Sequence, residues 1–157
     1  MKFRIVAVGR RMPAWIAAGC AEYTQRMPRE CRVELVEIKP AARTGGGSVQ
    51  QWLALEAQRI RAALPSRAFV VVLDEHGRPC ATQELARRIE RWRREGLDVA
   101  FVIGGADGTA RELQSEADWL MSLSPLTLPH GLVRVLLAEQ LYRAASLIAG
   151  HPYHRGE

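Results

Sequence analysis

The chain has 157 residues, which is enough for one domain with a substantial core and short of the length at which two become common. Hydrophobic residues make up 48% and charged residues 25%, and no apolar run approaches the roughly 20 residues of a membrane span. Arg4 interrupts the short apolar stretch at the N-terminus, which argues against a secretion signal. These features predict a single cytoplasmic domain over residues 1–157 with no membrane partner.

The net charge of +5 favours an anionic partner, and nucleic acid is the commonest one. The charge does not by itself specify RNA, because the arginine-rich run 87–95 mixes both signs at helical spacing and is typical of a solvated helix face. The three cysteines are scattered without a C-x-x-C pair, which argues against a disulfide framework and a zinc site. We therefore expect Cys20, Cys31 and Cys80 to be buried or incidental thiols.

The first part of the chain predicts a strand, a helix and a second strand. The apolar, β-branched runs over residues 3–8 and 33–38 are typical of strands. Pro13 stands at a favourable first position of the helix between them. The residues expected to share one face of this helix are Trp15, Gly19 and Tyr23.

A loop and an amphipathic helix follow. The three consecutive glycines Gly45–Gly47 predict a mobile loop within residues 39–48. The next helix ends before Pro65, because proline cannot continue a helix. Its apolar stripe consists of Leu53, Ala57, Ile60 and Leu64.

The central segment predicts two buried parallel strands joined by a helix. The runs 68–73 and 99–103 are continuously apolar, which is the pattern of strands covered on both faces. A helix from about Thr82 to Glu95 connects them in a right-handed crossover, with Gly96 as its C-terminal cap. Its inward side chains are expected to be Leu85, Ile89 and Trp92.

The last third predicts two helices and a short strand. Residues 109–112 fit a capping box, so a short helix should begin directly after the glycine-rich turn. A strand is expected over residues 120–124, and a long helix over Leu132–Ile148 that ends at Gly150. The apolar positions of the long helix are Val133, Leu136, Leu137, Leu141, Ala144 and Ile148.

Alternating strands and helices predict an α/β fold, with an open and mainly parallel sheet flanked by helices. Ligands bind to such sheets beyond the carboxyl ends of the strands, so the loops 74–78, 104–108 and 125–130 are the candidate site. The glycine loop lacks the dinucleotide and phosphate-loop spacings, which argues against a nucleoside triphosphate. Its glycines allow a flat ligand to approach closely, and an ordinary tight turn explains them equally well.

The segment 122–130 combines two prolines with leucines that a loop cannot easily bury. Apolar side chains and backbone hydrogen-bonding groups together would suit an adenine ring, since ligand pockets are lined in this way. An exposed leucine without a role is the alternative. We interpret the segment as a rigid pocket wall.

A resemblance to a known family rests on four stretches of the C-terminal half, which are Phe101–Gly108, Ser122–His130, Arg134–Ala144 and His151–Arg155. With Val6–Gly9 and the small size, the whole chain resembles the bacterial RlmH family. The resemblance implies a SPOUT fold with a trefoil knot in about residues 100–157. It also implies a homodimer that uses S-adenosylmethionine to methylate N3 of a pseudouridine in helix 69 of 23S ribosomal RNA, acting on the assembled ribosome.

The same resemblance implies where the cofactor binds. Family members hold S-adenosylmethionine in a bent shape inside the knot and dimerise next to this pocket. The positions expected to contact the cofactor are Leu73, Gly104, Gly105, Leu123, Ser124, Pro125, Leu126, Thr127 and Leu128. These positions lie in the strand-end loops chosen from the pattern of elements, and the final helix is expected to contribute to the dimer interface.

The acceptor nitrogen belongs to a weakly acidic imide and becomes nucleophilic only as its proton leaves. Arginines stabilise the developing anion, and the candidates are Arg134, Arg143 and Arg155. Glu139 precedes Arg143 by four residues and is placed to orient it, with a surface ion pair as the alternative.

His130 and His154 are alternative acceptors of the imide proton, since imidazole titrates near neutral pH. We expect the target-base side of the active site to be formed by a C-terminal tail that reaches across the dimer, with a solvated tail as the alternative. The complete set of candidate catalytic residues is Glu139, Arg143, Tyr153, His154, Arg155 and His130. No metal is expected, because nothing completes a site around His151 and His154.

Two other functions remain open at this point. One is a SPOUT methyltransferase that acts on another RNA, such as transfer RNA. The other is a non-catalytic RNA-binding module of ribosome assembly, which the basic charge would equally support.

Overall fold

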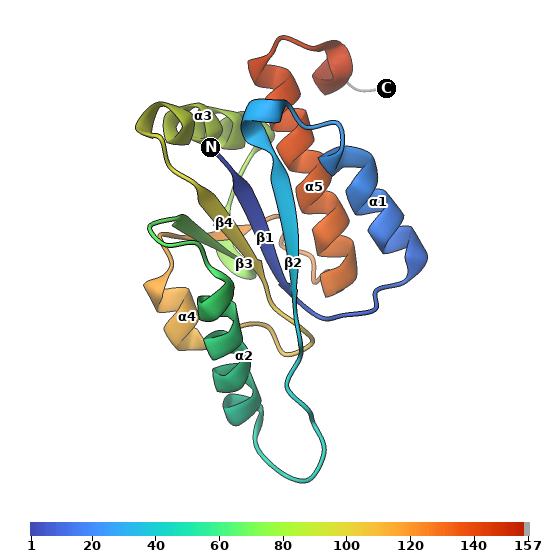
Figure 1. Cartoon of the computed structure of the whole chain (residues 1–157), viewed down its shortest axis with the longest axis vertical. Helices are drawn as coiled ribbons and strands as arrows, with labels where there is room; N and C mark the ends of the chain where they lie inside the picture. Colours follow the sequence, from blue (N-terminus) through green and yellow to red (C-terminus); the bar gives the residue numbers. More distant parts are fainter. Residues whose placement is uncertain (156–157) are drawn as a thin grey trace.

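A five-stranded sheet forms the centre of the molecule (Figure 1) in the computed structural model, which describes residues 1–155. All neighbouring strands are parallel, in the order β2-β1-β4-β3-β5. The strands are β1 (Phe3–Val8), β2 (Val33–Ile38), β3 (Phe69–Pro79), β4 (Val99–Ile103) and β5 (Trp119–Ser122). The predicted α/β class with a parallel sheet is confirmed. The trefoil knot and the single-domain span 1–157 stay predictions.

Helices cover both faces of the sheet, as Figure 1 shows. Helix α5 packs between α1 and α3 on one face, while α2 and α4 contribute to the core of the other. The helices are α1 (Ala14–Thr24), α2 (Val49–Ala63), α3 (Thr82–Glu95), α4 (Arg111–Glu116) and α5 (His130–Ile148), with 3₁₀ turns η1 (Arg29–Cys31) and η2 (Pro152–Arg155). Within residues 1–155, no helix combines the length and apolar character that a membrane crossing requires.

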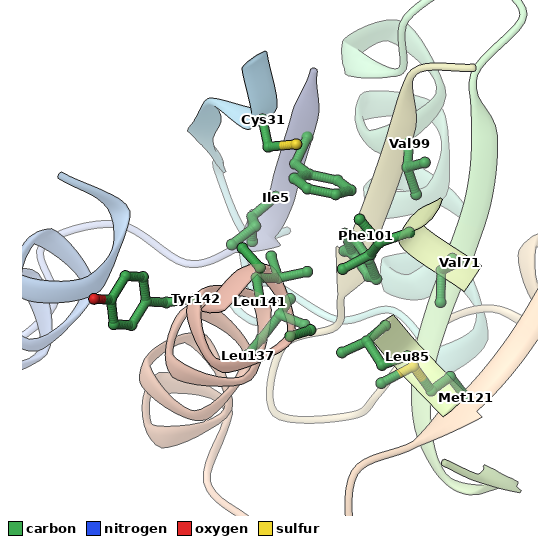
Figure 2. Packing of buried hydrophobic residues seen from close by; sticks show 14 of the residues in the cluster. Ile5, Cys31, Val71, Leu85, Val99, Phe101, Met121, Leu137, Leu141 and Tyr142 are labelled. Carbon is green, nitrogen blue, oxygen red and sulfur yellow. The ribbon is translucent and has the colours of Figure 1, made fainter. Parts of the chain in front are cut away.

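Two hydrophobic cores lie on opposite faces of the sheet, because successive strand residues point to opposite sides. In β1, Ile5 packs into the core under α5, whereas Val6 packs into the core under α2. Figure 2 shows Phe101 of β4 facing Leu137 and Leu141 of α5. Every residue of β4 is buried, which confirms the expected strand covered on both faces.

Strand β3 is longer than the sequence predicts, and the expected loop 74–78 lies within it. Met121 of β5 pairs with both Leu73 and Arg78, so the residues between these two bulge out of the ladder before pairing resumes. A Cβ on Gly77 would lie 2.7–2.9 Å from the β5 backbone. Position 77 in the bulge therefore requires glycine. The hydrophobic pattern could not predict this extension of β3, because residues 74–79 are mainly polar.

The face of α1 that carries Trp15, Gly19 and Tyr23 is only partly buried. Trp15 is 60% exposed, and the buried residues of the helix are Ile16 and Cys20. Gly19 does face α5, where its Cβ position lies 3.1 Å from a methyl group of Val135. Apolar residues occur on several sides of this helix, so spacing alone does not decide which side is buried.

The boundaries of the later helices are close to those predicted, but one cap is wrong. Gly96 caps α3 with a left-handed φ of 68°, as expected. Ala110, not Thr109, is the N-cap of α4, and no side chain caps this helix. The Thr109 hydroxyl instead accepts a hydrogen bond from Gln114 at 3.0 Å, so the capping-box pattern reflects a different local contact. Cys20 and Cys31 are buried and Cys80 is partly buried, all as free thiols, as expected.

Candidate active site

A cavity of about 420 Å³ opens at the carboxyl edge of the sheet, within the size range of small-molecule sites. The bulged part of β3 and the loops that follow β4 and β5 form its walls, together with the start of α5. The predicted cofactor residues that line it are Leu73, Gly104, Gly105, Leu123, Ser124, Leu126, Thr127 and Leu128. Pro125 is not among the lining residues. The structure thus brings together positions more than 50 residues apart in the sequence, as the strand-end argument predicts.

The turn after β4 explains the glycines of this wall. A Cβ on Gly104 would lie 2.5 Å from the carbonyl carbon and oxygen of Gly108, which no real Cβ tolerates. The amide of Gly108 donates to the carbonyl of Gly105 at 3.1 Å and closes the turn. Glycine is therefore required at position 104 for the turn to close on itself, apart from any ligand.

Two carboxylates of the candidate segment 74–78 line the cavity, although the sequence analysis gave neither a role. The Asp74 carboxylate accepts hydrogen bonds from the His76 amide at 2.8 Å and from the Gln114 side chain at 3.3 Å. The Glu75 carboxylate accepts the hydroxyl hydrogen of Thr127 at 2.5 Å, so it joins two walls of the cavity. The sequence signal that could have identified them is their position directly after the apolar run 68–73.

His130 is the first residue of α5 and lines the cavity. Burial lowers the pKa of its imidazole, and the nearby positive charge of Arg134 lowers it further. Both effects disfavour the charged form, so His130 is neutral at neutral pH and one ring nitrogen is free to accept a proton.

Arg134 does not take the role predicted from the sequence. Its side chain is 1% exposed, forms an ion pair with Glu37 at 2.8 Å and donates to the carbonyl of Gly9 at 2.9 Å. A guanidinium committed to a carboxylate and to backbone carbonyls holds β1, β2 and α5 together, and Arg134 does not line the cavity. Arg134 was a candidate only as an arginine able to stabilise a developing anion, and residue type does not show how deeply a side chain is buried.

A second cluster of predicted residues forms on the second half of α5. The Glu139 carboxylate accepts hydrogen bonds from Arg143 at 2.8 Å and from the Tyr153 hydroxyl at 3.1 Å. The Tyr153 ring lies against that of Tyr142, with a centroid distance of 4.7 Å. The tail through Arg155 is thus packed on α5 as a 3₁₀ turn, which argues against a fully solvated tail.

Along α5 the cavity and the tail cluster come closest at Val133 and Glu139, which are about 9 Å apart along the helix axis, but His130 lies farther away. His130 and Arg143 are separated by thirteen residues of one helix, or about 20 Å at 1.5 Å per residue. Helix α5 thus contributes its N-terminal end to the cavity and its second half to the tail cluster. Of the predicted catalytic residues, Glu139, Arg143 and Tyr153 therefore meet in one protomer, whereas His130 lies apart from them.

The phenol of Tyr153 gives a prediction for the tail cluster. Burial first, and then its hydrogen bond to Glu139, raise the pKa of Tyr153 to about 12. The neutral phenol is the favoured form, so its stabilising contribution is complete below pH ~10 and is lost as the pH rises toward 12. In an ultraviolet titration, Glu139→Gln should move this transition part of the way back, because burial remains. Tyr153→Phe should remove the transition, and an unchanged curve for Glu139→Gln would contradict the contact.

The described part of the chain contains no group of three or more His, Cys, Asp or Glu side chains arranged to hold a metal ion. The His151 ring contacts the Tyr153 amide at 3.3 Å.

Comparison with known proteins agrees with this architecture. A family model described as "Predicted SPOUT methyltransferase" matches residues 1–154. Proteins called "Ribosomal RNA large subunit methyltransferase H" from Burkholderia vietnamiensis strain G4 and from Nitrosospira multiformis are 58% and 59% identical over 155 residues, with 99% of each chain covered. A crystal structure of a probable methyltransferase from Bordetella pertussis Tohama I has a TM-score of 0.59 at 18% identity, covering 91% of this chain and 93% of its own, which supports the fold.

The parallel sheet, the cavity at its carboxyl edge and the family match define a methyltransferase of the SPOUT class. Within this class, the full-length identity of 58% and more shows that the chain belongs to the ribosomal RNA large subunit methyltransferase H family, RlmH. The resemblance inferred from the sequence is confirmed.

Proposed function

We propose that this chain transfers a methyl group from S-adenosylmethionine to N3 of a pseudouridine in helix 69 of 23S ribosomal RNA, on the assembled ribosome in the cytoplasm. The observation that carries the proposal is the match with relatives named for methylation of large-subunit ribosomal RNA, which covers 99% of both chains. The cavity supports it, because it is built from the loops that the family resemblance assigns to the cofactor.

The residues of the cavity fit S-adenosylmethionine. Leucines 73, 123, 126 and 128 offer apolar surface for an adenine ring, and the glycine turn exposes backbone hydrogen-bonding groups. Asp74 and Glu75 place negative charge beside the cavity in a chain of net charge +5, which suits a ligand with a cationic sulfur and a ribose. The cofactor supplies a methyl group already activated by the positive sulfonium, so the protein contributes binding and orientation.

Residues of the chain have separate tasks in this proposal. His130, kept neutral by burial, and His154 of the tail are the alternative groups for accepting the imide proton. Arg143 and Arg155 stabilise the negative charge that develops on the base. Glu139 fixes Arg143 through the 2.8 Å ion pair, and Tyr153 shares the same carboxylate.

In this proposal, His130 and the tail cluster meet when two protomers combine. Because about 20 Å of α5 separates His130 from Arg143, we expect the tail of one protomer to serve the cavity of its partner. We therefore expect a homodimer in which α5 contributes to an isologous interface. Light scattering at micromolar concentration should give twice the mass of one chain, and a monomeric mass would contradict the composite site.

Methyl transfer from labelled S-adenosylmethionine tests the function directly. The acceptors to compare are intact ribosomes, separated subunits, naked ribosomal RNA and transfer RNA. The expected result is label in large-subunit RNA of intact ribosomes, because a small protein recognises RNA mainly through shape and phosphates. Preferential labelling of transfer RNA would support a different SPOUT methyltransferase, and RNA binding without cofactor binding would support an assembly module.

A further inference from the structure

We propose that Arg43 is a positioning residue for the cofactor site. It holds the turn Gly105–Gly108 through Asp107 and so keeps the backbone of the cavity wall in its binding shape. The proposal rests on the proposed function, which places the cofactor in this cavity. Arg43 itself does not line the cavity; it acts from the loop between β2 and α2.

One side of the Arg43 guanidinium is held by a buried carboxylate. Glu56 of α2 is 2% exposed, and one oxygen accepts hydrogen bonds from the Ala41 amide at 3.0 Å and from Arg43 at 2.6 Å. Arg43 also donates to the Ala41 carbonyl at 2.6 Å, and its guanidinium lies 5.4 Å from the centre of the Trp52 ring. A buried carboxylate requires a charged partner, so these contacts fix the guanidinium relative to α2.

The other side of the Arg43 guanidinium contacts the turn that forms the cavity wall. The second terminal nitrogen of Arg43 donates to the Asp107 carboxylate at 2.9 Å. Asp107 is the third residue of the turn that the hydrogen bond between Gly108 and Gly105 closes. Its neighbours Ala106 and Gly108 line the cavity, whereas Asp107 is absent from the lining. The guanidinium therefore holds the turn from the side away from the ligand.

A glycine-rich turn needs such a restraint. Glycine samples more backbone conformations than other residues, and Gly108 has a φ of +77° in this turn. When only a fraction of molecules has the competent shape, the apparent dissociation constant rises by the reciprocal of that fraction. A charge-assisted bond to a buried anchor raises the fraction. Arg43 thus controls cofactor affinity and leaves the methyl-transfer step unchanged.

Asp107→Asn is the sharpest test, because it removes the charge at the turn and leaves the Glu56–Arg43 pair intact. We expect the dissociation constant for S-adenosylmethionine, measured by calorimetry, to rise about tenfold. The KM for the cofactor should rise by the same factor, with kcat at saturating cofactor unchanged. Arg43→Lys should show a similar loss, because an ammonium cannot bridge both carboxylates as a guanidinium does. The double variant should bind the cofactor as tightly as Asp107→Asn alone, because both substitutions remove the same contact between Arg43 and Asp107.

Arg61→Gln is the matched control. Arg61 also extends from α2 and pairs with Glu116 at the end of α4, at 2.9 and 2.8 Å, but it does not contact the turn. Its loss should leave cofactor affinity unchanged. Equal affinities of the original chain and Asp107→Asn would overturn the role of Arg43 and leave the proposed function standing, as would equal weakening by Arg61→Gln. Failure of the original chain to bind S-adenosylmethionine would overturn both.

Discussion

Removal of residues 153–157 should lower methyl transfer to ribosomes about a thousandfold, while cofactor affinity and dimer mass stay near their original values. The tail packs against α5 beside Tyr142 and Arg143, about 20 Å along this helix from His130, and its described residues do not line the cavity, so its loss should not disturb that cavity. It nevertheless carries Tyr153, His154 and Arg155, which we assign to the target base. Labelled methyl transfer, calorimetry and light scattering measure the three quantities.

The control is a chain that lacks only residues 156 and 157, which lie outside the described residues; it should retain activity. A composite site also predicts the behaviour of mixed dimers. Mixed dimers of the chain without 153–157 and a full-length Gly104→Val chain should recover one working centre, formed by the intact cavity of the first and the tail of the second. Full activity of the homodimer without 153–157 would refute the role of the tail. No recovery in a verified mixed dimer would refute the crossing.

Gly104→Val should abolish detectable binding of S-adenosylmethionine in calorimetry, both with and without a metal chelator. From the sequence, the expected reason was that side-chain atoms would fill space needed by the ligand. The structure gives a stronger reason, because even a Cβ at this position would lie 2.5 Å from the Gly108 backbone and 2.9 Å from Thr109. The turn would have to open, and the cavity wall would lose its shape. Gly104→Ala should therefore also weaken binding strongly.

Gly96→Ala is a control for general backbone strain. Gly96 has a φ of +68°, so alanine there costs about 1 kcal/mol, but it precedes β4 and lies at the opposite edge of the sheet from the cavity. Its cofactor affinity should match that of the original chain. Unchanged affinity in Gly104→Val would contradict the site, and a metal requirement would contradict metal-free binding.

The sequence was most informative where one local feature decides the structure. Strand β4 and helix α3 have the predicted bounds, because an unbroken apolar run and the Gly96 cap leave few alternatives. The positions of the cavity loops followed from parallel strands ending at one edge of a sheet. Identification of the family depended on residues in these same loops, which explains why sequence and structure converge on one cavity.

The errors arose where burial depends on distant partners. Trp15 is exposed although it shares a helix face with Gly19, and Arg134 is buried although it was a candidate for stabilising the developing anion. In both cases the neighbouring elements decide: α1 meets α5 through the small residue Gly19, and Arg134 meets Glu37 of β2, which lies almost 100 residues earlier. Helical periodicity describes one element and contains no information about which other elements cover it.

The sequence by itself determined the α/β class, the edge of the sheet that holds the cavity, and the membership in the family. Only the tertiary structure decided that His130 lies in the cavity while Glu139, Arg143 and Tyr153 form a separate cluster, and that Arg43 connects Glu56 to Asp107 beside the cavity. The physical reason is the range of the interactions. Strand and helix patterns arise from residues a few positions apart, whereas the 2.9 Å contact between Arg43 and Asp107 joins residues 64 positions apart and exists only when the whole sheet has formed.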